Sequence, residues 1–334
     1  MNNQSFFVRI LRKALFMGLI FFIMGVLLSG SFRDVSWAQE FPSREIRLII
    51  PYGAGGAIDN ATRIFANRSE KILGVPVVVI NNAAGGGAAG ALSVSQAKPD
   101  GYTLLAGTSG VLILKPILTP DVRFRHTDFS PICRTIGIPT ALWVTNEAPW
   151  KTLKDLVDYA KGNPGKLRVT VGQAGTLIDV LANLFKAEAG IDITNIPTTA
   201  GAAQTAALLG GHSELSIGSV SQGISFLKAG RLRALASTHK VPGFPMIKTF
   251  EEEGYPGVTM KEWVGIFSPK GISNPVLTKL TKAFEMACND PSMREQLEKL
   301  YTLPEYLGPE ETSKSLDRGH ELALKILKQS GMVK

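Results

Sequence analysis

Hydrophobic and polar positions along the first part of the chain follow two alternating patterns. Apolar runs at 44–51 (REIRLIIP), 75–80 (VPVVVI) and 102–108 (YTLLAGT) indicate strands. The second run is almost entirely β-branched, which is typical of a strand buried on both faces of a parallel sheet. Residues 59–73 carry apolar side chains at helical spacing, and Gly74 is placed to end that helix. This succession of strand, helix and strand predicts an α/β domain.

The same unit recurs in the second half of the chain. Strand patterns lie at 166–172 (KLRVTVG), 193–197 (ITNIP), 213–221 (SELSIGSVS) and 231–238 (RLRALAST). They alternate with small-residue loops and helical patterns, which again predicts an α/β unit. Residues from Pro275 onward are predicted to be mostly helical.

Two extended segments, 140–150 and 262–269, connect these units. The chain is therefore predicted to form two lobes joined by two extended crossovers, with a ligand cleft between them and the second lobe inserted within the first. We expect hinges near 140–145 and 262–267. The expected bounds are 39–142 plus 265–334 for lobe 1 and 143–264 for lobe 2.

The N-terminal sequence has the pattern of a secretory signal peptide. Basic residues within 9–13 precede an uncharged apolar run at 14–28, and SWA at 36–38 fits a small-x-small cleavage site. An uncleaved anchor is the alternative, but a bilayer span needs about 20 apolar residues. The run therefore favours cleavage, with residues 1–38 as the signal peptide and a periplasmic mature chain.

Charge and composition narrow the class of ligand. The formal charge of the full chain is +8, and it falls to +5 without residues 1–38, which carry four basic residues and one acidic residue. The basic residues are scattered and form no block, which argues against nucleic acid as a partner. A modest positive field suits a small anionic solute.

Glycine-rich sequence follows the first two predicted strands, PYGAGGAIDN at 51–60 and NNAAGGGAAG at 81–90, and the third ends in small residues at 107–110. Ligands of open α/β sheets bind beyond the carboxyl ends of the strands, where all three stretches fall. Glycine allows backbone to approach a ligand closely, and a helix N-terminus offers unpaired N–H groups. These stretches predict an anion site. Asp59 is interpreted as a cap for its helix, an assignment that a solute with an amino group would reverse.

Catalytic and cofactor motifs are weak. GGGAAG at 85–90 matches a dinucleotide pattern, but it follows a second strand and lacks the acidic residue expected for a ribose. The four histidines are scattered, and no nucleophile is paired with a base. A disulfide between Cys133 and Cys288 and two buried free thiols are both open alternatives, and their spacing fits no zinc site. We expect binding rather than turnover, without a cofactor or metal.

Several motifs together resemble one family. FPSREIRLIIPYGAGGAIDNATRIFA and LGVPVVVINNAAGGGAAGALSVSQAKPDGYTLL are similar to the opening of the Bug family, the extracytoplasmic solute-binding receptors of tripartite tricarboxylate transporters. The resemblance continues through KTLKDLVDYAKGNPGKLRV, LKAGRLRALAST, FEEEGYPGV and EWVGIFSPKGISNPVLTKL. It implies a type II periplasmic-binding fold that closes on a small carboxylated solute and acts with the large and small membrane subunits of a transporter. A monomer without nucleic acid is expected.

The resemblance also implies the binding residues, with one carboxylate held by backbone N–H groups of the first lobe. In that lobe they are Tyr52, Gly53, Ala54, Gly55, Gly56, Ala57, Asp59, Asn81, Gly85, Gly86, Gly87, Thr108 and Ser109. In the facing lobe they are Gln173, Ala174, Gly175, Thr176, Thr198, Thr199 and Ser219.

This chain departs from the family pattern chiefly in the second lobe. Asp179-Val180 replaces a common His-Leu, Thr198-Thr199 falls where Tyr-Lys is common, and Gly218 replaces a frequent acidic residue; in the first lobe Ile58 replaces a hydroxyl residue. The two threonines in place of Tyr and Lys predict a smaller and less basic specificity wall, and hence a different solute, for which an aromatic or uncharged distal group is one candidate. A sensor feeding a signalling protein and an exported enzyme acting on a carboxylate are the alternatives.

Overall fold

A computed structural model of the chain describes residues 16–18, 40–198, 201–258, 260–329 and 331–333. Residues Met1–Phe41 form a unit separate from Pro42–Lys334, and the fold described below is that of the second unit. The predicted signal peptide, 1–38, lies almost wholly outside the described residues. Within the described ranges, no helix is long and apolar enough to cross a membrane.

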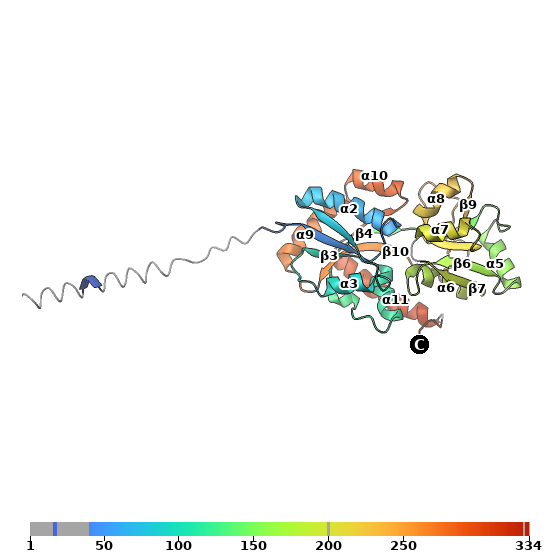
Figure 1. Cartoon of the computed structure of the whole chain (residues 1–334), viewed down its shortest axis with the longest axis horizontal. Helices are drawn as coiled ribbons and strands as arrows, with labels where there is room; N and C mark the ends of the chain where they lie inside the picture. The colour runs from blue at the N-terminus through green and yellow to red at the C-terminus, as the bar shows by residue number, and fades with distance from the viewer. Residues whose placement is uncertain (1–15, 19–39, 199–200, 259, 330, 334) are drawn as a thin grey trace, which may run out of the picture. The chain divides into compact units, whose positions relative to one another are not determined.

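The first sheet has six strands in the order β11-β4-β10-β3-β1-β2 (Figure 1). Strand β1 pairs in parallel with both β2 and β3, whereas β10 is antiparallel to its neighbours β3 and β4. The bounds are Ile46–Ile50 (β1), Val77–Asn81 (β2), Thr103–Thr108 (β3), Phe129–Ile138 (β4), Glu262–Pro269 (β10) and Leu303–Leu307 (β11). The three strands predicted in this sheet are confirmed, and β4 and β11 are additional strands that the sequence pattern does not predict.

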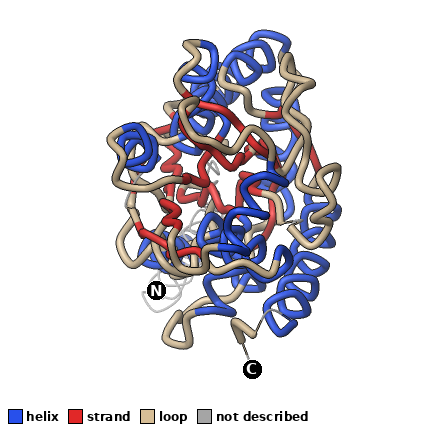
Figure 2. Tube along the Cα trace, turned by 90° about the vertical axis from the view of Figure 1, so that its right-hand side faces the viewer, coloured by secondary structure: helices blue, strands red, loops and turns tan. Residues whose placement is uncertain are grey.

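The strands lie toward the centre of the molecule, with helices around them (Figure 2). The bounds are Ala57–Leu73 (α2), Ala88–Ser95 (α3), Lys115–Leu118 (α4), Asn274–Cys288 (α9), Pro291–Lys299 (α10) and Pro309–Gln329 (α11), with a 3₁₀-helix at His126–Asp128. Gly74 ends α2 in the left-handed conformation, as predicted. The predicted third loop at 107–110 is wrong, because β3 runs through Thr108 and a π-helix begins at Gly110 (Gly110–Leu114).

The second sheet has five strands in the order β7-β6-β8-β5-β9. The parallel strands β7, β6 and β8 are followed by β5, which is antiparallel to β8 and β9. The bounds are Thr140–Thr145 (β5), Leu167–Val171 (β6), Ile193–Pro197 (β7), Leu215–Ser219 (β8) and Leu232–Ser237 (β9), with helices at Leu153–Gly162 (α5), Leu177–Ala189 (α6), Gly201–Leu209 (α7) and Val220–Lys228 (α8).

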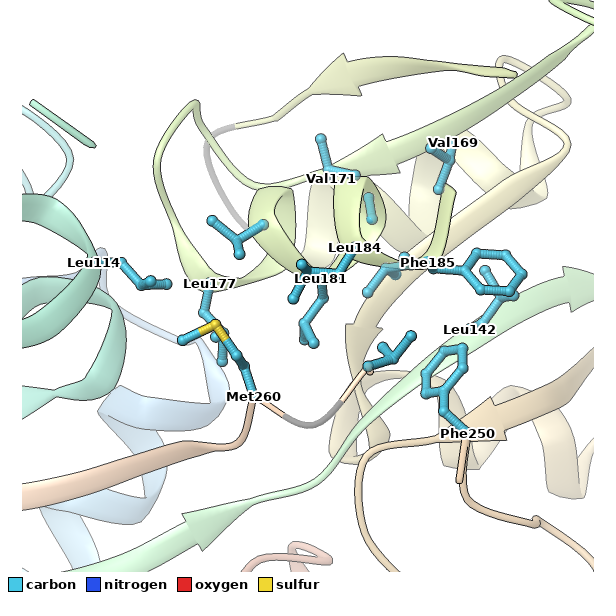
Figure 3. Packing of buried hydrophobic residues seen from close by; sticks show 14 of the residues in the cluster. Leu114, Leu142, Val169, Val171, Leu177, Leu181, Leu184, Phe185, Phe250 and Met260 are labelled. Carbon is cyan, nitrogen blue, oxygen red and sulfur yellow. The ribbon is translucent and has the colours of Figure 1, made fainter. Parts of the chain in front are cut away.

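A buried apolar cluster holds α6 in place (Figure 3). Leu181 and Phe185 point from this helix into the cluster, where the rings of Phe185 and Phe250 are tilted by 53° with centroids 5.6 Å apart. Burial of this apolar face is the main term stabilising the helix. Its position matters because the N-terminus of α6 faces the cavity described below.

Both cysteines are buried in the core of the first lobe as free thiols. Burial raises the pKa of Cys133 well above its ordinary value and that of Cys288 to about 12. The thiols are therefore neutral and unreactive at physiological pH. They behave as small apolar side chains of the core.

Gly107 allows the closest packing in this core. A Cβ added there would lie 2.5 Å from Leu112 Cδ1 and 2.8 Å from Phe267 Cδ2, and both neighbours are fully buried. We predict that Gly107→Ala lowers the free energy of unfolding by about 1–3 kcal/mol through overpacking. Gly162→Ala is the matched control, since a Cβ there meets nothing within 4 Å. Urea unfolding of both variants checks this, and equal stabilities would contradict it.

Candidate functional site

A cavity of about 170 Å³ is lined from both sheets. Its lining comes from the loop after β1 and the loop after β2 on one side, and from the β6–α6 loop, α7 and the β8–α8 junction on the other. The lining residues are Pro51, Tyr52, Gly53, Ala54, Gly56, Ala57, Ile58, Asp59, Ala83, Gly86, Ile138, Thr140, Gly172, Gln173, Thr176, Leu177, Ile178, Thr198, Gly201, Gln204, Ser219, Gln222 and Glu262.

The structure brings part of the expected site together. The expected residues that line the cavity are Tyr52, Gly53, Ala54, Gly56, Ala57, Asp59, Gly86, Gln173, Thr176, Thr198 and Ser219. The expected residues outside the lining are Gly55, Asn81, Gly85, Gly87, Thr108, Ser109, Ala174 and Gly175. Thr199 lies outside the described residues. Most of those outside the lining support the loops, as their contacts show.

A carboxylate folds the first glycine loop back onto its own helix. Gly55 has φ 80°, and its N–H donates to Asp59 Oδ2 at 2.9 Å. Arg63 Nε donates to both Asp59 oxygens at 3.0 Å, and Asn81 Nδ2 donates to Oδ1 at 2.9 Å. Burial alone would raise the pKa of Asp59, but the hydrogen bonds from Arg63, Gly55 and Asn81 outweigh it and lower that pKa below its ordinary value. Asp59 therefore holds the loop through the N–H of Gly55, whereas the N-cap residue, Gly56, has no side-chain cap.

The second lobe repeats this arrangement. Gly175 has φ 75°, its N–H donates to Asp179 Oδ2 at 3.0 Å, and Asn195 Nδ2 donates to Asp179 Oδ1 at 3.0 Å. Asp179 does not line the cavity, so the expectation that it forms part of the specificity wall is wrong. The sequence carried the signal: a Gly four residues before an Asp, with an Asn at or near the end of the next strand, occurs in both halves. We call each of these arrangements a loop clamp.

Glycines of the second loop serve two different purposes. A Cβ at Gly87 would lie 2.7 Å from the carbonyl O of Pro51, so this glycine permits close packing of backbone. Gly86 lines the cavity, and a Cβ there would lie 2.9 Å from Lys115 Nζ. Lys115 is 8% exposed, and its side chain lies beside this loop. The ammonium group of Lys115 is therefore close to the backbone of Gly86.

Glu262 is the main residue that the sequence reading missed. It lines the cavity, is 5% exposed, and accepts a hydrogen bond from Ser109 Oγ at 3.2 Å. Burial raises its pKa to about 7, although hydrogen bonds from Thr108 and Ser109 act in the opposite direction. Tyr52 is next in this network, because its hydroxyl is 2.8 Å from Thr108 Oγ1. The available signal was one charged residue opening an otherwise apolar strand, EWVGIF.

Two glutamines form the polar wall of the second lobe. Gln204 is 5% exposed, and a Cβ at Gly218 would lie 3.2 Å from its Oε1. A Cβ at Gly201 would overlap the amide of Gln222. Gly218 therefore leaves room for an amide where an acidic residue is common, which explains one expected departure. No Lys, Arg or His lines the cavity, and the described residues contain no group of side chains suited to a metal ion.

Comparison with known proteins gives a consistent result. The family model described as "Tripartite tricarboxylate transporter family receptor" (TctC) matches residues 61–318. The UPF0065 protein in the gbd 5′ region of Cupriavidus necator is 32% identical over 301 residues, which is 89% of this chain and 90% of that protein.

Two solved structures have the same two-lobed fold. Periplasmic binding protein BugD superposes with a TM-score of 0.80 at 27% identity, over 88% of this chain and 100% of that chain. Rpa4515 of R. palustris, solved with adipate, gives a TM-score of 0.82 at 26% identity, over 87% of this chain and 99% of that chain. The expected fold class, a two-lobed periplasmic-binding protein, is confirmed.

The loop clamp around Asp59 gives a stability prediction. Asp59→Asn replaces one carboxylate oxygen, which accepts hydrogen bonds, by an NH₂ group that would face the N–H donors of the loop clamp. We therefore expect the free energy of unfolding at pH 7 to fall by about 1–3 kcal/mol. Because folding lowers the pKa of Asp59, its contribution is present at neutral pH and is lost as pH falls below about 4. The gap between wild type and variant should therefore narrow in acid. Urea unfolding at both pH values measures it, with the exposed Asp121→Asn as control; a gap that widens in acid would refute this assignment.

Proposed function

The chain belongs to the tripartite tricarboxylate transporter receptor family, the Bug family, and from that membership we propose that it captures a small carboxylate in its cavity and delivers it to a membrane transporter. Members are solute-binding receptors rather than enzymes. The solute, the binding contacts and the membrane partner are the proposal.

One observation carries the proposal: an uncapped helix N-terminus from each lobe meets the cavity. The N-cap residues are Gly56 for α2 and Thr176 for α6, neither receives a side-chain cap, and both line the cavity. The first N–H groups of each helix are thus available, and the helix dipole favours negative charge there. Two such ends facing one cavity suit a solute with carboxylates at both ends.

The walls between these two ends support the same class of solute. Ile58 and Ile178 occupy the same position in the first turn of their helices, and Ile138 and Leu177 add further apolar surface. An aliphatic spacer between two carboxylates would contact these side chains. The adipate in Rpa4515 is a molecule of this form, and we propose a dicarboxylate with an apolar spacer for this chain.

Lys115 supplies the positive charge that the lining lacks. Lys115 is 8% exposed, and its ammonium group lies beside Gly86, which lines the cavity. Its charge would attract a carboxylate bound at the second glycine loop. Backbone N–H donors and this cation together would hold the anion without a direct ion pair between the anion and a lining residue.

Closure and location complete the proposal. Lobes at 39–142 plus 265–334 and at 143–264 would close on the solute about hinges near 140–145 and 262–267, because the solute contacts both lobes. Export through the signal peptide 1–38 would place the receptor in the periplasm, where it would act as a monomer, without a cofactor, on the large and small membrane subunits of the transporter.

Gly56 provides the cleanest test of the binding contacts. Its φ is −77°, and a Cβ would meet only the carbonyl O of Gly53, at 3.8 Å. Gly56→Val should therefore fold normally yet fill the space in front of the α2 N-terminus, weakening carboxylate binding at least about tenfold, or 1.4 kcal/mol. Gly55 is unsuitable because its positive φ makes any substitution strained.

The measurement is a thermal-shift and calorimetric screen of residues 39–334 against mono-, di- and tricarboxylates, aromatic acids, acidic amino acids and NAD. A ligand of the folded state raises the melting temperature with concentration. The matched control is Gly308→Val, an equally open glycine directly before α11. Equal affinity of wild type and Gly56→Val would refute the contact, and a response to NAD alone would refute the function.

A further inference from the structure

The side chain of Glu262 is a carboxylic acid at the wall of a cavity that we propose binds a carboxylate. Glu262 opens β10, lines the cavity and is 95% withdrawn from solvent. Its Oε1 accepts from Ser109 Oγ, and no described residue forms an ion pair with it. A carboxylate anion bound nearby would repel an ionised Glu262 strongly, because solvent screening is weak at this depth.

The charged groups around Glu262 do not relieve this repulsion. Tyr52 belongs to the loop after β1, and its hydroxyl contacts Thr108. Asp59, on α2, lines the same cavity. Arg134 of β4 lowers the pKa of Glu262, but its guanidinium is paired with Glu305 at 2.8 Å. His239, from the segment after β9, has a pKa lowered to about 4, chiefly by burial, so it is neutral.

Two further cations complete the set. Lys261 precedes Glu262 in the chain and has an exposed side chain, whereas Lys115 lies behind Gly86. Neither makes a hydrogen bond or ion pair with Glu262 among the described residues. The remaining way to remove the repulsion is to protonate the carboxylate.

We propose that Glu262 is a specificity-determining residue that enters the complex as a neutral carboxylic acid and donates a hydrogen bond to a solute oxygen, so that capture of the anion takes up one proton. This inference rests on the proposed function. The proton comes from bulk water and is held on Glu262 Oε2 or Oε1, while the solute keeps its charge. A pKa near 7 in the empty protein makes the neutral form readily available.

The neutral acid also selects the solute. A protonated Glu262 presents an O–H donor to the cavity, and the oxygens of a bound carboxylate can accept from it. The same neutral group gives no attraction to a cationic group of a solute at that position. A solute with an ammonium group would instead need Glu262 ionised. The two cases differ in the sign of their pH dependence, because the first loses affinity as pH rises through the pKa of Glu262 and the second gains it.

The experiment is isothermal titration calorimetry with adipate as the probe, from pH 6 to pH 9, in two buffers of different ionisation enthalpy. Adipate affinity of wild type should fall about tenfold per pH unit above the pKa of the empty protein, with about one proton taken up in that range. Glu262→Gln should lose this dependence, take up no proton, and bind at least about tenfold more tightly than wild type at pH 9. Exposed Glu251→Gln is the control and should follow wild type.

Each result decides the proposal. A wild-type affinity independent of pH, an unchanged slope in Glu262→Gln, or loss of adipate binding by a correctly folded Glu262→Gln would overturn it while leaving carboxylate capture intact. Tightening with rising pH for an amino acid of the panel, with adipate unbound, would also overturn it and assign Glu262 to an ammonium group. Failure of every carboxylate at every pH would refute the proposed function and this inference together.

Discussion

A backbone N–H bonded to an aspartate four residues ahead is the interaction on which the rest of this structure depends. Gly55 and Asp59 form it in one lobe, and Gly175 and Asp179 form it in the other. Each bond bends a loop that only a positive φ allows, and so turns the following helix N-terminus toward the cavity. Because each carboxylate is bonded to its own loop, neither caps the N-cap residue of its helix, and only Asp59 also lines the cavity. The backbone N–H groups of the first helical turn are left available to a ligand.

The electrostatics of the cavity follow from this arrangement. Backbone N–H groups at the two helix ends, a lysine beside Gly86 and a buried glutamate contribute to the potential of the cavity. The two side chains carry opposite charges, so a substitution at either one would change that potential. In the proposed function, the anion would be held without a basic residue in the lining, and Glu262 would discriminate among anions.

Local sequence patterns were sufficient for the parallel strands of both sheets and for the first two glycine loops, because buried β-branched runs and positive-φ glycines are local properties. They did not predict β4 and β11 of the first sheet. Three features required tertiary information. The roles of Asp179 and Gly87 depend on which backbone lies opposite them. The small residues at 107–110 continue a strand into a π-helix instead of forming a loop. Glu262 is far in sequence from the loops it joins, and its strand pattern marks only an apolar element.

The first of the two connections between the sheets is a single residue, Pro139, between Ile138 of β4 and Thr140 of β5. Its ring fixes φ, and its carbonyl O accepts from the N–H of Val220 at 2.8 Å. Thr140 is tied to Thr238 through both its N–H and its carbonyl O. Few dihedral angles are free at this junction, which restricts how the two sheets can rotate relative to each other there. In the closure proposed above, little conformational entropy would then be lost at this connection, and its geometry would limit the direction of rotation.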